Sequence, residues 1–200
     1  MNQELRAWME ETIWTAGELA AKGFVTGSAG NISFLYDNEV YISKSGTLFG
    51  RLSDTGFAKV RLDGTILENG NPSKEYPMHL ELYQKQNIKA VLHTHSFYTT
   101  LWSCLEQLDT DELIPSYTPY LNMQFKKIKQ VPYDKPGSEE LFQAFAAVAD
   151  NEADGYILKN HGAFVTGNSM QEAYAKLAEL ETSAKMAWYL NGTGAAKISY

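Results

Sequence analysis

Three of the four histidines in the chain have a spacing and a local context from which a metal site could be built. His93 and His95 end a mainly apolar run, residues 90–95 (AVLHTH), and side chains two residues apart on a β-strand point to the same face. His161 lies just past another apolar run, in residues 158–162 (LKNHG). Three neutral imidazoles with an open fourth position are typical of a catalytic rather than a structural zinc site. We therefore predict a metal site here, although the spacing alone equally allows hydrogen-bonded structural histidines.

A carboxylate and the fourth histidine lie near the start of a predicted helix that follows the turn at residues 71–75 (NPSKE). Pro77 fits the first turn of such a helix. If that turn already includes Glu75, then Glu75 and His79 are four residues apart on one helical face. The pair could bind the metal, or His79 could make a structural hydrogen bond to Glu75. The sequence leaves both possibilities open.

The chain has two loops of small polar residues, and the first could bind an anion. Residues 24–31 (FVTGSAGN) lie between a predicted helix and a predicted strand, and residues 43–47 (SKSGT) follow a predicted hairpin. Glycine-rich loops of this kind can present backbone N–H groups to an anion. The alternative is a plain turn, because the first loop matches neither the P-loop nor the dinucleotide-binding fingerprint.

Composition narrows the class of protein. A chain of 200 residues with 44% hydrophobic and 20% charged residues fits one ordinary globular domain, which we expect to span residues 1–200. The net charge of −7 argues against a nucleic-acid partner. The basic run at residues 126–129 is interpreted as a solvated loop or strand edge, although an anion contact is possible there.

Cysteine usage and the N-terminal residues bear on the compartment. Cys104 is the only cysteine, so no intrachain disulfide can form and the cysteine ligands of many structural zinc sites are missing. Residues 1–21 carry four glutamates, which argues against a signal peptide, and no apolar run has the length of a membrane helix. We expect a cytoplasmic protein without a membrane partner.

The elements that must position these residues follow from hydrophobic periodicity and turn signals. Helices are predicted over residues 5–21 (capped by Gly23), 96–105, 138–150 (capped by Ser138) and 169–190 (capped by Ser169 and ended by 191–192), and a further helix follows the turn at residues 71–75. Strands or extended pieces are predicted over residues 32–36, 40–42, 58–62, 65–67, 89–95, 113–123, 128–133, 155–159 and 164–165, with a solvated acidic connection at 109–112. The expected fold is α/β of the α+β type, with a central, mostly antiparallel sheet and helices on both faces.

Together these motifs resemble the class II aldolase/adducin family in order and spacing, over essentially the whole chain. The matching segments are residues 26–31 (TGSAGN), 45–46 (SG), 72–75 (PSKE), 93–96 (HTHS) and 160–162 (NHG). The resemblance implies a zinc ion held by His93, His95 and His161. Glu75 would be a fourth ligand able to swing off and act as acid or base. Mn²⁺, Co²⁺ or Fe²⁺ could take the place of zinc.

The same resemblance implies a substrate site and an assembly. The residues expected to bind the substrate phosphate are Gly30, Asn31, Ser45, Gly46, Ser73 and Lys74. Family members form C4 tetramers, so we expect a homotetramer with active sites at subunit interfaces. Tyr120 matches a tyrosine that reaches into a neighbouring subunit's site in the aldolases, where it would deal with the aldehyde oxygen.

Within the family, several segments look most like the 3-oxo-tetronate 4-phosphate decarboxylases. These are residues 114–120, 131–137 and 179–185, together with Lys74, whereas Thr94 and residues 122–127 depart from that subgroup. The resemblance implies a lyase that acts on a phosphorylated sugar or sugar acid through a metal-bound enediolate. The best match is decarboxylation to dihydroxyacetone phosphate and CO2.

Three questions stay open at this point. An L-fuculose-phosphate-type aldolase or a sugar-phosphate epimerase would use the same metal chemistry, with Glu75 as the candidate proton donor. A non-catalytic adducin-like scaffold is the alternative of another class. Lys74 could balance a substrate carboxylate, reinforce the phosphate site, or pair with Glu75 or Asp63.

Overall fold

One eight-stranded sheet forms the centre of the computed structural model, which describes residues 2–67, 70–106 and 112–198. The strand order is β4-β3-β2-β1-β5-β8-β7-β6. Its strands are β1 (Asn31–Tyr36), β2 (Glu39–Ser43), β3 (Phe57–Arg61), β4 (Ile66–Leu67), β5 (Ala90–Thr94), β6 (Ile128–Val131), β7 (Gly155–Leu158) and β8 (Gly162–Gly167). Neighbouring strands are antiparallel except β6 and β7, which are parallel. The mostly antiparallel sheet is therefore confirmed.

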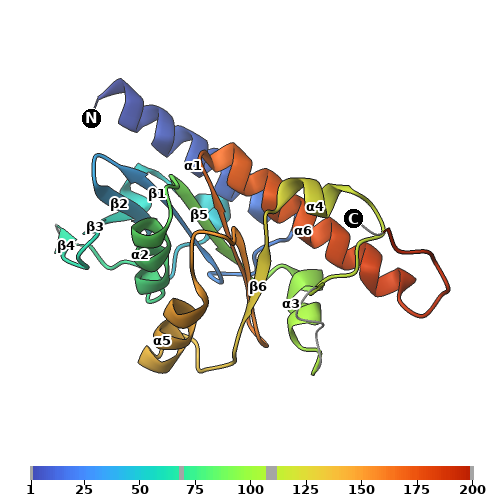
Figure 1. Ribbon diagram of the computed structural model, residues 1–200. Helices are drawn as coiled ribbons and strands as arrows, with labels where there is room; N and C mark the ends of the chain where they lie inside the picture. Colours follow the sequence, from blue (N-terminus) through green and yellow to red (C-terminus); the bar gives the residue numbers. More distant parts are fainter. Residues whose placement is uncertain (1, 68–69, 107–111, 199–200) are drawn as a thin grey trace.

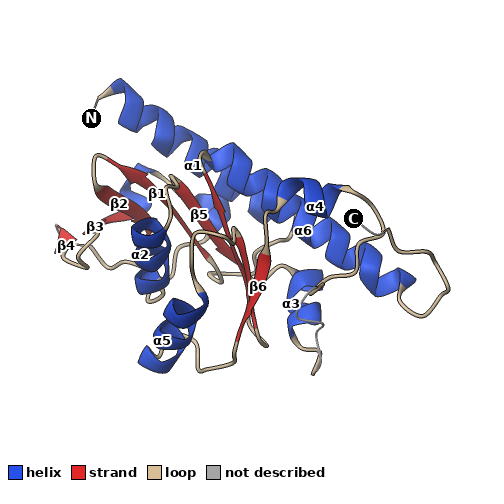
Figure 2. Ribbon diagram, viewed as in Figure 1, coloured by secondary structure: helices blue, strands red, loops and turns tan. Residues whose placement is uncertain are grey.

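Helices cover both faces of the sheet, as Figures 1 and 2 show. The α-helices are α1 (Gln3–Ala21), α2 (Tyr76–Lys85), α3 (Phe97–Ser103), α4 (Tyr120–Gln124), α5 (Glu139–Val148) and α6 (Met170–Leu190), with 3-10 turns at Phe49–Arg51 and Asp54–Gly56. The two long helices α1 and α6 run side by side on one face, and α2 and α5 lie on the other. No helix in the described residues is long and apolar enough to cross a membrane.

The alternation of side chains along the central strand β5 explains why two cores form. Leu92 belongs to the cluster under α1 and α6, whereas Val91 belongs to the cluster under α2 and α5. Because successive strand side chains point to opposite faces, His93 lies on the same face as Val91. The first of the metal-site candidates thus faces the α2 side of the sheet.

Helix ends follow the capping signals of the sequence. Ser138 and Ser169 accept hydrogen bonds from the backbone N–H groups three residues on, at 3.2 and 3.1 Å. Gly23, just past the end of α1, has the left-handed backbone (φ 72°) expected of a C-terminal cap. These predictions are confirmed, with boundaries shifted by at most two residues at α3 and α5.

One predicted element is wrong. Residues 120–124 form α4 and not the C-terminal part of an extended piece. Leu121 and Phe125 are buried four residues apart, while Met123 between them is 72% exposed, which is a helical rather than an alternating pattern. Pro119 stands at the helix start, where its fixed φ is compatible with helical geometry. Of the predicted acidic connection, residues 109–111 lie outside the described part of the chain.

Candidate active site

The three candidate histidines converge at one end of the sheet. His93 is the fourth residue of β5, and its cross-strand neighbour on β1 is Asn31. His95 lies just beyond β5, and His161 lies in the turn between β7 and β8. Asn160, of a residue type that tolerates left-handed backbone, makes that turn with φ 55°. One ring nitrogen from each histidine lies within 4.8 Å of those of the other two, and the Nε2 atoms of His93 and His95 are 3.0 Å apart.

Glu75 completes the cluster from the start of α2. Its two carboxylate oxygens lie 3.2 Å from Nε2 of His93 and 3.2 Å from Nε2 of His161. Glu75 occupies the N-cap position, just before the first helical turn. His79 lies outside the histidine cluster, and its two ring nitrogens contact Ser33 and Asn31. Of the two possibilities left open, the second is closer: His79 makes structural hydrogen bonds, but to Ser33 and Asn31 and not to Glu75.

The donor set fits a divalent metal ion. The Nδ1 atom of His93 is 3.0 Å from the carbonyl oxygen of Ala163, which can only accept, so the ring proton sits on Nδ1. The Nε2 lone pair of His93 then faces the imidazole of His95 and the carboxylate of Glu75. A cation bound between these electron-pair donors would stabilise the arrangement. A carbonyl that fixes the tautomer in this way is typical of metal-binding histidines. Buried Nδ1 of His161 has no such partner among the described residues.

The ionisation states suit the same role. Burial lowers the pKa of the fully buried His93 well below its ordinary value, and burial also lowers the pKa of His95. Burial opposes the charge on Glu75. The hydrogen bond from the Asn31 amide favours the charged carboxylate, and the pKa of Glu75 lies below its ordinary value. Neutral imidazoles beside an ionised carboxylate are the protonation states that metal ligands require.

A cavity of about 350 Å³ opens beside this cluster. Its lining is Ser28, Ala29, Gly30, Asn31, Lys44, Ser45, Gly46, Ser73, Lys74, Glu75, His95, Pro136, Gly137 and His161. Every residue predicted to bind the phosphate is in this lining. The backbone N–H of Ser45 donates to the carbonyl of Asn71 (2.8 Å), and that of Ser73 donates to the carbonyl of Ser43 (3.1 Å). These bonds join the loop at residues 43–47 to the turn at residues 71–75 beside the cavity.

Sequence reasoning missed part of the lining. Lys44 lies inside a loop that had been singled out, so its place could have been anticipated; its ammonium group donates to the carbonyl of Thr55 at 2.8 Å. Pro136 and Gly137 carry no sequence signal that connects them with this site, because only the tertiary fold brings them beside Lys74. Lys74 makes no ion pair with Glu75 or Asp63 in the described part of the chain. Tyr120 is not in the lining and is 57% exposed at the start of α4.

The close approach of two backbone segments explains why residue 30, in the cavity lining, is a glycine. Gly30 has φ 89°, and a Cβ added there would lie 2.6 Å from the carbonyl oxygen of His93. Only a residue without a side chain allows the first polar loop to approach the strand end that carries His93 so closely.

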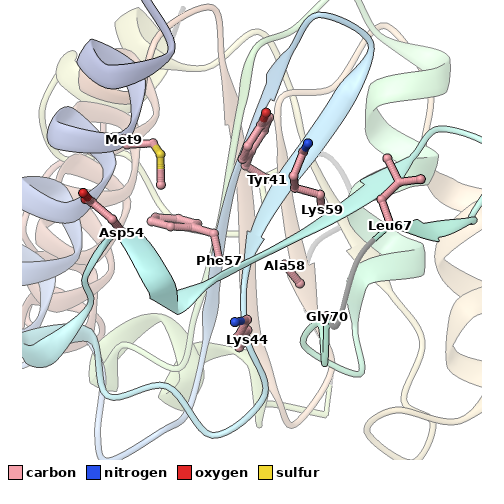
Figure 3. A pocket seen from close by; sticks show the side chains of 9 residues that line it. All are labelled: Met9, Tyr41, Lys44, Asp54, Phe57, Ala58, Lys59, Leu67 and Gly70. Atoms are coloured by element: carbon pink, nitrogen blue, oxygen red, sulfur yellow. The ribbon is translucent and has the colours of Figure 1, made fainter. Parts of the chain in front are cut away.

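A second cavity, of about 320 Å³, lies beside α1 at strands β2 and β3 (Figure 3). Its lining is Met9, Tyr41, Lys44, Asp54, Phe57, Ala58, Lys59, Leu67 and Gly70. Lys59 in this cavity pairs with Glu39 at 2.9 Å and lies 5.5 Å from the centre of the Tyr41 ring. Among the described residues of this lining, Asp54 is the one carboxylate and there is no histidine, so these residues offer no metal-ligand set comparable to that of the first cavity.

Comparison with known proteins shows the family to which the chain belongs. The model of the Class II Aldolase and Adducin N-terminal domain matches residues 10–188, and the chain belongs to this family. A 3-oxo-tetronate 4-phosphate decarboxylase from Escherichia coli O6:H1 is 40% identical over 193 residues, or 95% of this chain and 89% of that protein. An L-fuculose phosphate aldolase from Methanococcus maripaludis (strain C5) is 37% identical over 172 residues, or 86% of this chain and 90% of that protein.

A solved crystal structure has the same fold as this chain. The crystal structure of YgbL from Escherichia coli, described as an aldolase, epimerase or decarboxylase, superposes with a TM-score of 0.91 and 34% identity. The match covers 96% of this chain and 94% of that one. The predicted family, fold class and enzyme class are confirmed: the protein is a lyase of the class II aldolase type.

Proposed function

We propose that residues 1–200 form one class II aldolase-like domain that decarboxylates 3-oxo-tetronate 4-phosphate to dihydroxyacetone phosphate and CO2. The observation that carries this proposal is one cavity lined by His95, His161, Glu75 and loops of small polar residues, with His93 buried in the same histidine cluster. The name of the relative from Escherichia coli O6:H1 supports the choice of substrate.

His93, His95 and His161, with Glu75 as a fourth ligand, would hold zinc in this enzyme. Bound zinc supplies Lewis-acid stabilisation of the negative charge that develops on substrate oxygens as the carbon–carbon bond breaks. The decarboxylation takes up one proton at the carbon that loses CO2. Glu75 lies at the cluster and in the cavity wall, and we assign it the transfer of that proton: the carboxylate swings off from the histidines, takes a proton from solvent and delivers it to this carbon.

The other residues of the lining would bind the charged groups of the substrate. Gly30, Asn31, Ser45, Gly46 and Ser73 line the cavity, where the glycine backbone N–H groups and the serine hydroxyls would be the donors for a phosphate. The substrate proposed here carries a carboxylate as well as a phosphate, whereas a ketose 1-phosphate has only the phosphate. Lys74, which lines the cavity and is exposed to solvent, could balance the second charge.

Aldol cleavage of an L-fuculose-1-phosphate-type substrate is the second candidate, favoured by the relative from Methanococcus maripaludis. This reaction needs a further group at the aldehyde oxygen. Tyr120 lies outside the cavity of its own chain and is exposed, which supports a place in a neighbouring subunit's site and a homotetramer.

Relative substrate preference decides between the two reactions. We expect kcat/KM to be highest for 3-oxo-tetronate 4-phosphate, with little cleavage of L-fuculose 1-phosphate or ribulose 1-phosphate. Lys74→Met should reduce this preference. Lys135→Met is the matched control, since Lys135 is an exposed lysine of the neighbouring loop outside the cavity lining. A wild-type preference for either ketose 1-phosphate would reassign the protein to the aldolases, and bound metal without turnover of any of the three would favour a binding scaffold.

A further inference from the structure

A buried row of hydrogen-bonding side chains leads from the interior of α2 to the proposed catalytic carboxylate. The Tyr83 hydroxyl lies 2.8 Å from that of Ser33, which lies 2.7 Å from Nδ1 of His79. Nε2 of His79 contacts the side-chain oxygen of Asn31, and the Asn31 amide nitrogen donates to Glu75 Oε2 at 2.9 Å. All five side chains are buried, and His79 is completely inaccessible to solvent.

The donor and acceptor of each hydrogen bond between Glu75 and Ser33 follow from the chemistry of the side chains. A carboxylate can only accept, so Asn31 must turn its NH2 group toward Glu75, and the same NH2 group reaches Ser73 at 3.0 Å. The Asn31 oxygen is left facing His79, which must therefore carry its ring proton on Nε2. The bare Nδ1 of His79 then accepts from the Ser33 hydroxyl.

We propose that His79 is a positioning residue: its Nε2–H group fixes the Asn31 amide, and the amide holds the Glu75 carboxylate against His93 and His161. The proposal rests on the role given to Glu75 under the proposed function. A reversed Asn31 amide would place its oxygen against the carboxylate, where no hydrogen bond can form. His79 keeps Asn31 from adopting that orientation.

The surroundings of His79 suit a permanent neutral donor. Burial lowers its pKa to about 3, so the ring gains no second proton at physiological pH. The edge of the ring packs against Phe164 with centroids 5.3 Å apart, which restricts its rotation. Phe164 also stacks on His93 at 4.2 Å, so the same aromatic side chain contacts the positioning histidine and a proposed metal ligand.

Two substitutions test the two ring nitrogens of His79 one at a time. His79→Gln places an amide nitrogen near the position of Nε2 and can still donate to Asn31. His79→Asn places its amide near the position of Nδ1 and can accept from Ser33 but leaves Asn31 without a donor. We expect kcat to fall roughly 10–100-fold in His79→Asn, as for other partners that orient a ligand, and much less in His79→Gln. Tyr83→Phe is the control, because it removes a hydroxyl from the same row and leaves the Nε2–H donor in place.

Coupling to Asn31 distinguishes positioning from general damage to the fold. In an Asn31→Ala background, His79→Asn should cause no further loss of kcat, because the side chain through which His79 acts is gone. The proposal is overturned if His79→Gln and His79→Asn lose equal activity, or if the His79→Asn loss is the same with and without Asn31.

Two readouts do not depend on the reaction. Nitrogen-15 NMR of the wild-type chain should show His79 protonated on Nε2 and bare at Nδ1, and the opposite tautomer overturns the proposal. Zinc affinity, measured by competition with a chelator, should fall roughly 10–100-fold in His79→Asn and be largely kept in His79→Gln. If both results hold while no proposed substrate is turned over, the positioning role stands and the proposed reaction fails.

Discussion

Replacing Gly30 by alanine tests how the first polar loop positions the strand end that carries His93. Gly30 and Gly27 both have left-handed backbone, with φ 89° and 60°. Alanine in this conformation costs roughly 1–2 kcal/mol at either position. Only at Gly30 does the new Cβ meet backbone, 2.6 Å from the His93 carbonyl oxygen, whereas at Gly27 nothing lies within 4 Å. Gly27→Ala is therefore a matched control for the backbone strain.

The difference between the two variants isolates the close approach. Crowding of a packed site costs about 1–3 kcal/mol, so Gly30→Ala should lose that much more stability than Gly27→Ala. For a chain of this size the extra loss lowers the melting temperature by roughly a further 2–12 °C. Denaturation of the metal-free variants measures it. Because the clash displaces the backbone of a proposed ligand, zinc affinity should also fall roughly 10–100-fold in Gly30→Ala and change little in Gly27→Ala.

Equal stability losses with unchanged zinc affinity in both variants would refute this reasoning. That result would mean that the strand end moves aside without consequence, and that the loop does not fix the position of His93.

Three further predictions concern the roles of single side chains. His93→Ala should lose bound metal and activity while the chain stays folded by circular dichroism, and a variant that keeps stoichiometric zinc in elemental analysis would remove His93 from the ligand set. Glu75→Gln should keep its fold but lose roughly 10²-fold or more of kcat if Glu75 transfers the proton; near-normal turnover would leave it a structural role only. For aldol cleavage, the reaction in which Tyr120 is given a role, mixing inactive Tyr120→Phe and His93→Ala chains should restore partial activity if Tyr120 acts in a neighbouring subunit. Hybrids that form without recovery, or a monomer in sedimentation, speak against a shared site.

Local patterns predicted the elements that carry the site. The apolar run before His93 and His95 gave a central strand, and the capping residues Ser138 and Ser169 gave the starts of α5 and α6. These predictions succeed because strand alternation and helix capping depend on residues close together in the chain. The close approach of His161 to His93 was inferred from histidine chemistry and could not have come from spacing alone.

Features that depend on tertiary contacts could not be predicted from the sequence. Burial of Leu121 makes residues 120–124 a helix although the surrounding prolines favour extended structure. The parallel pairing of β6 with β7 and the approach of Gly137 to the cavity likewise depend on long-range packing. His79 shows the same limit: its position on α2 was clear, but its partners on β1 became visible only in the folded chain.

A combined metal and product analysis of the purified protein tests the central claim most directly. We predict a single divalent metal ion per chain, with 3-oxo-tetronate 4-phosphate converted to equal amounts of CO2 and dihydroxyacetone phosphate. Removal of the metal by a chelator should abolish the reaction, and zinc should restore it. Full turnover by the metal-free protein, or a metal-loaded protein that releases no CO2 from this substrate, would contradict the account.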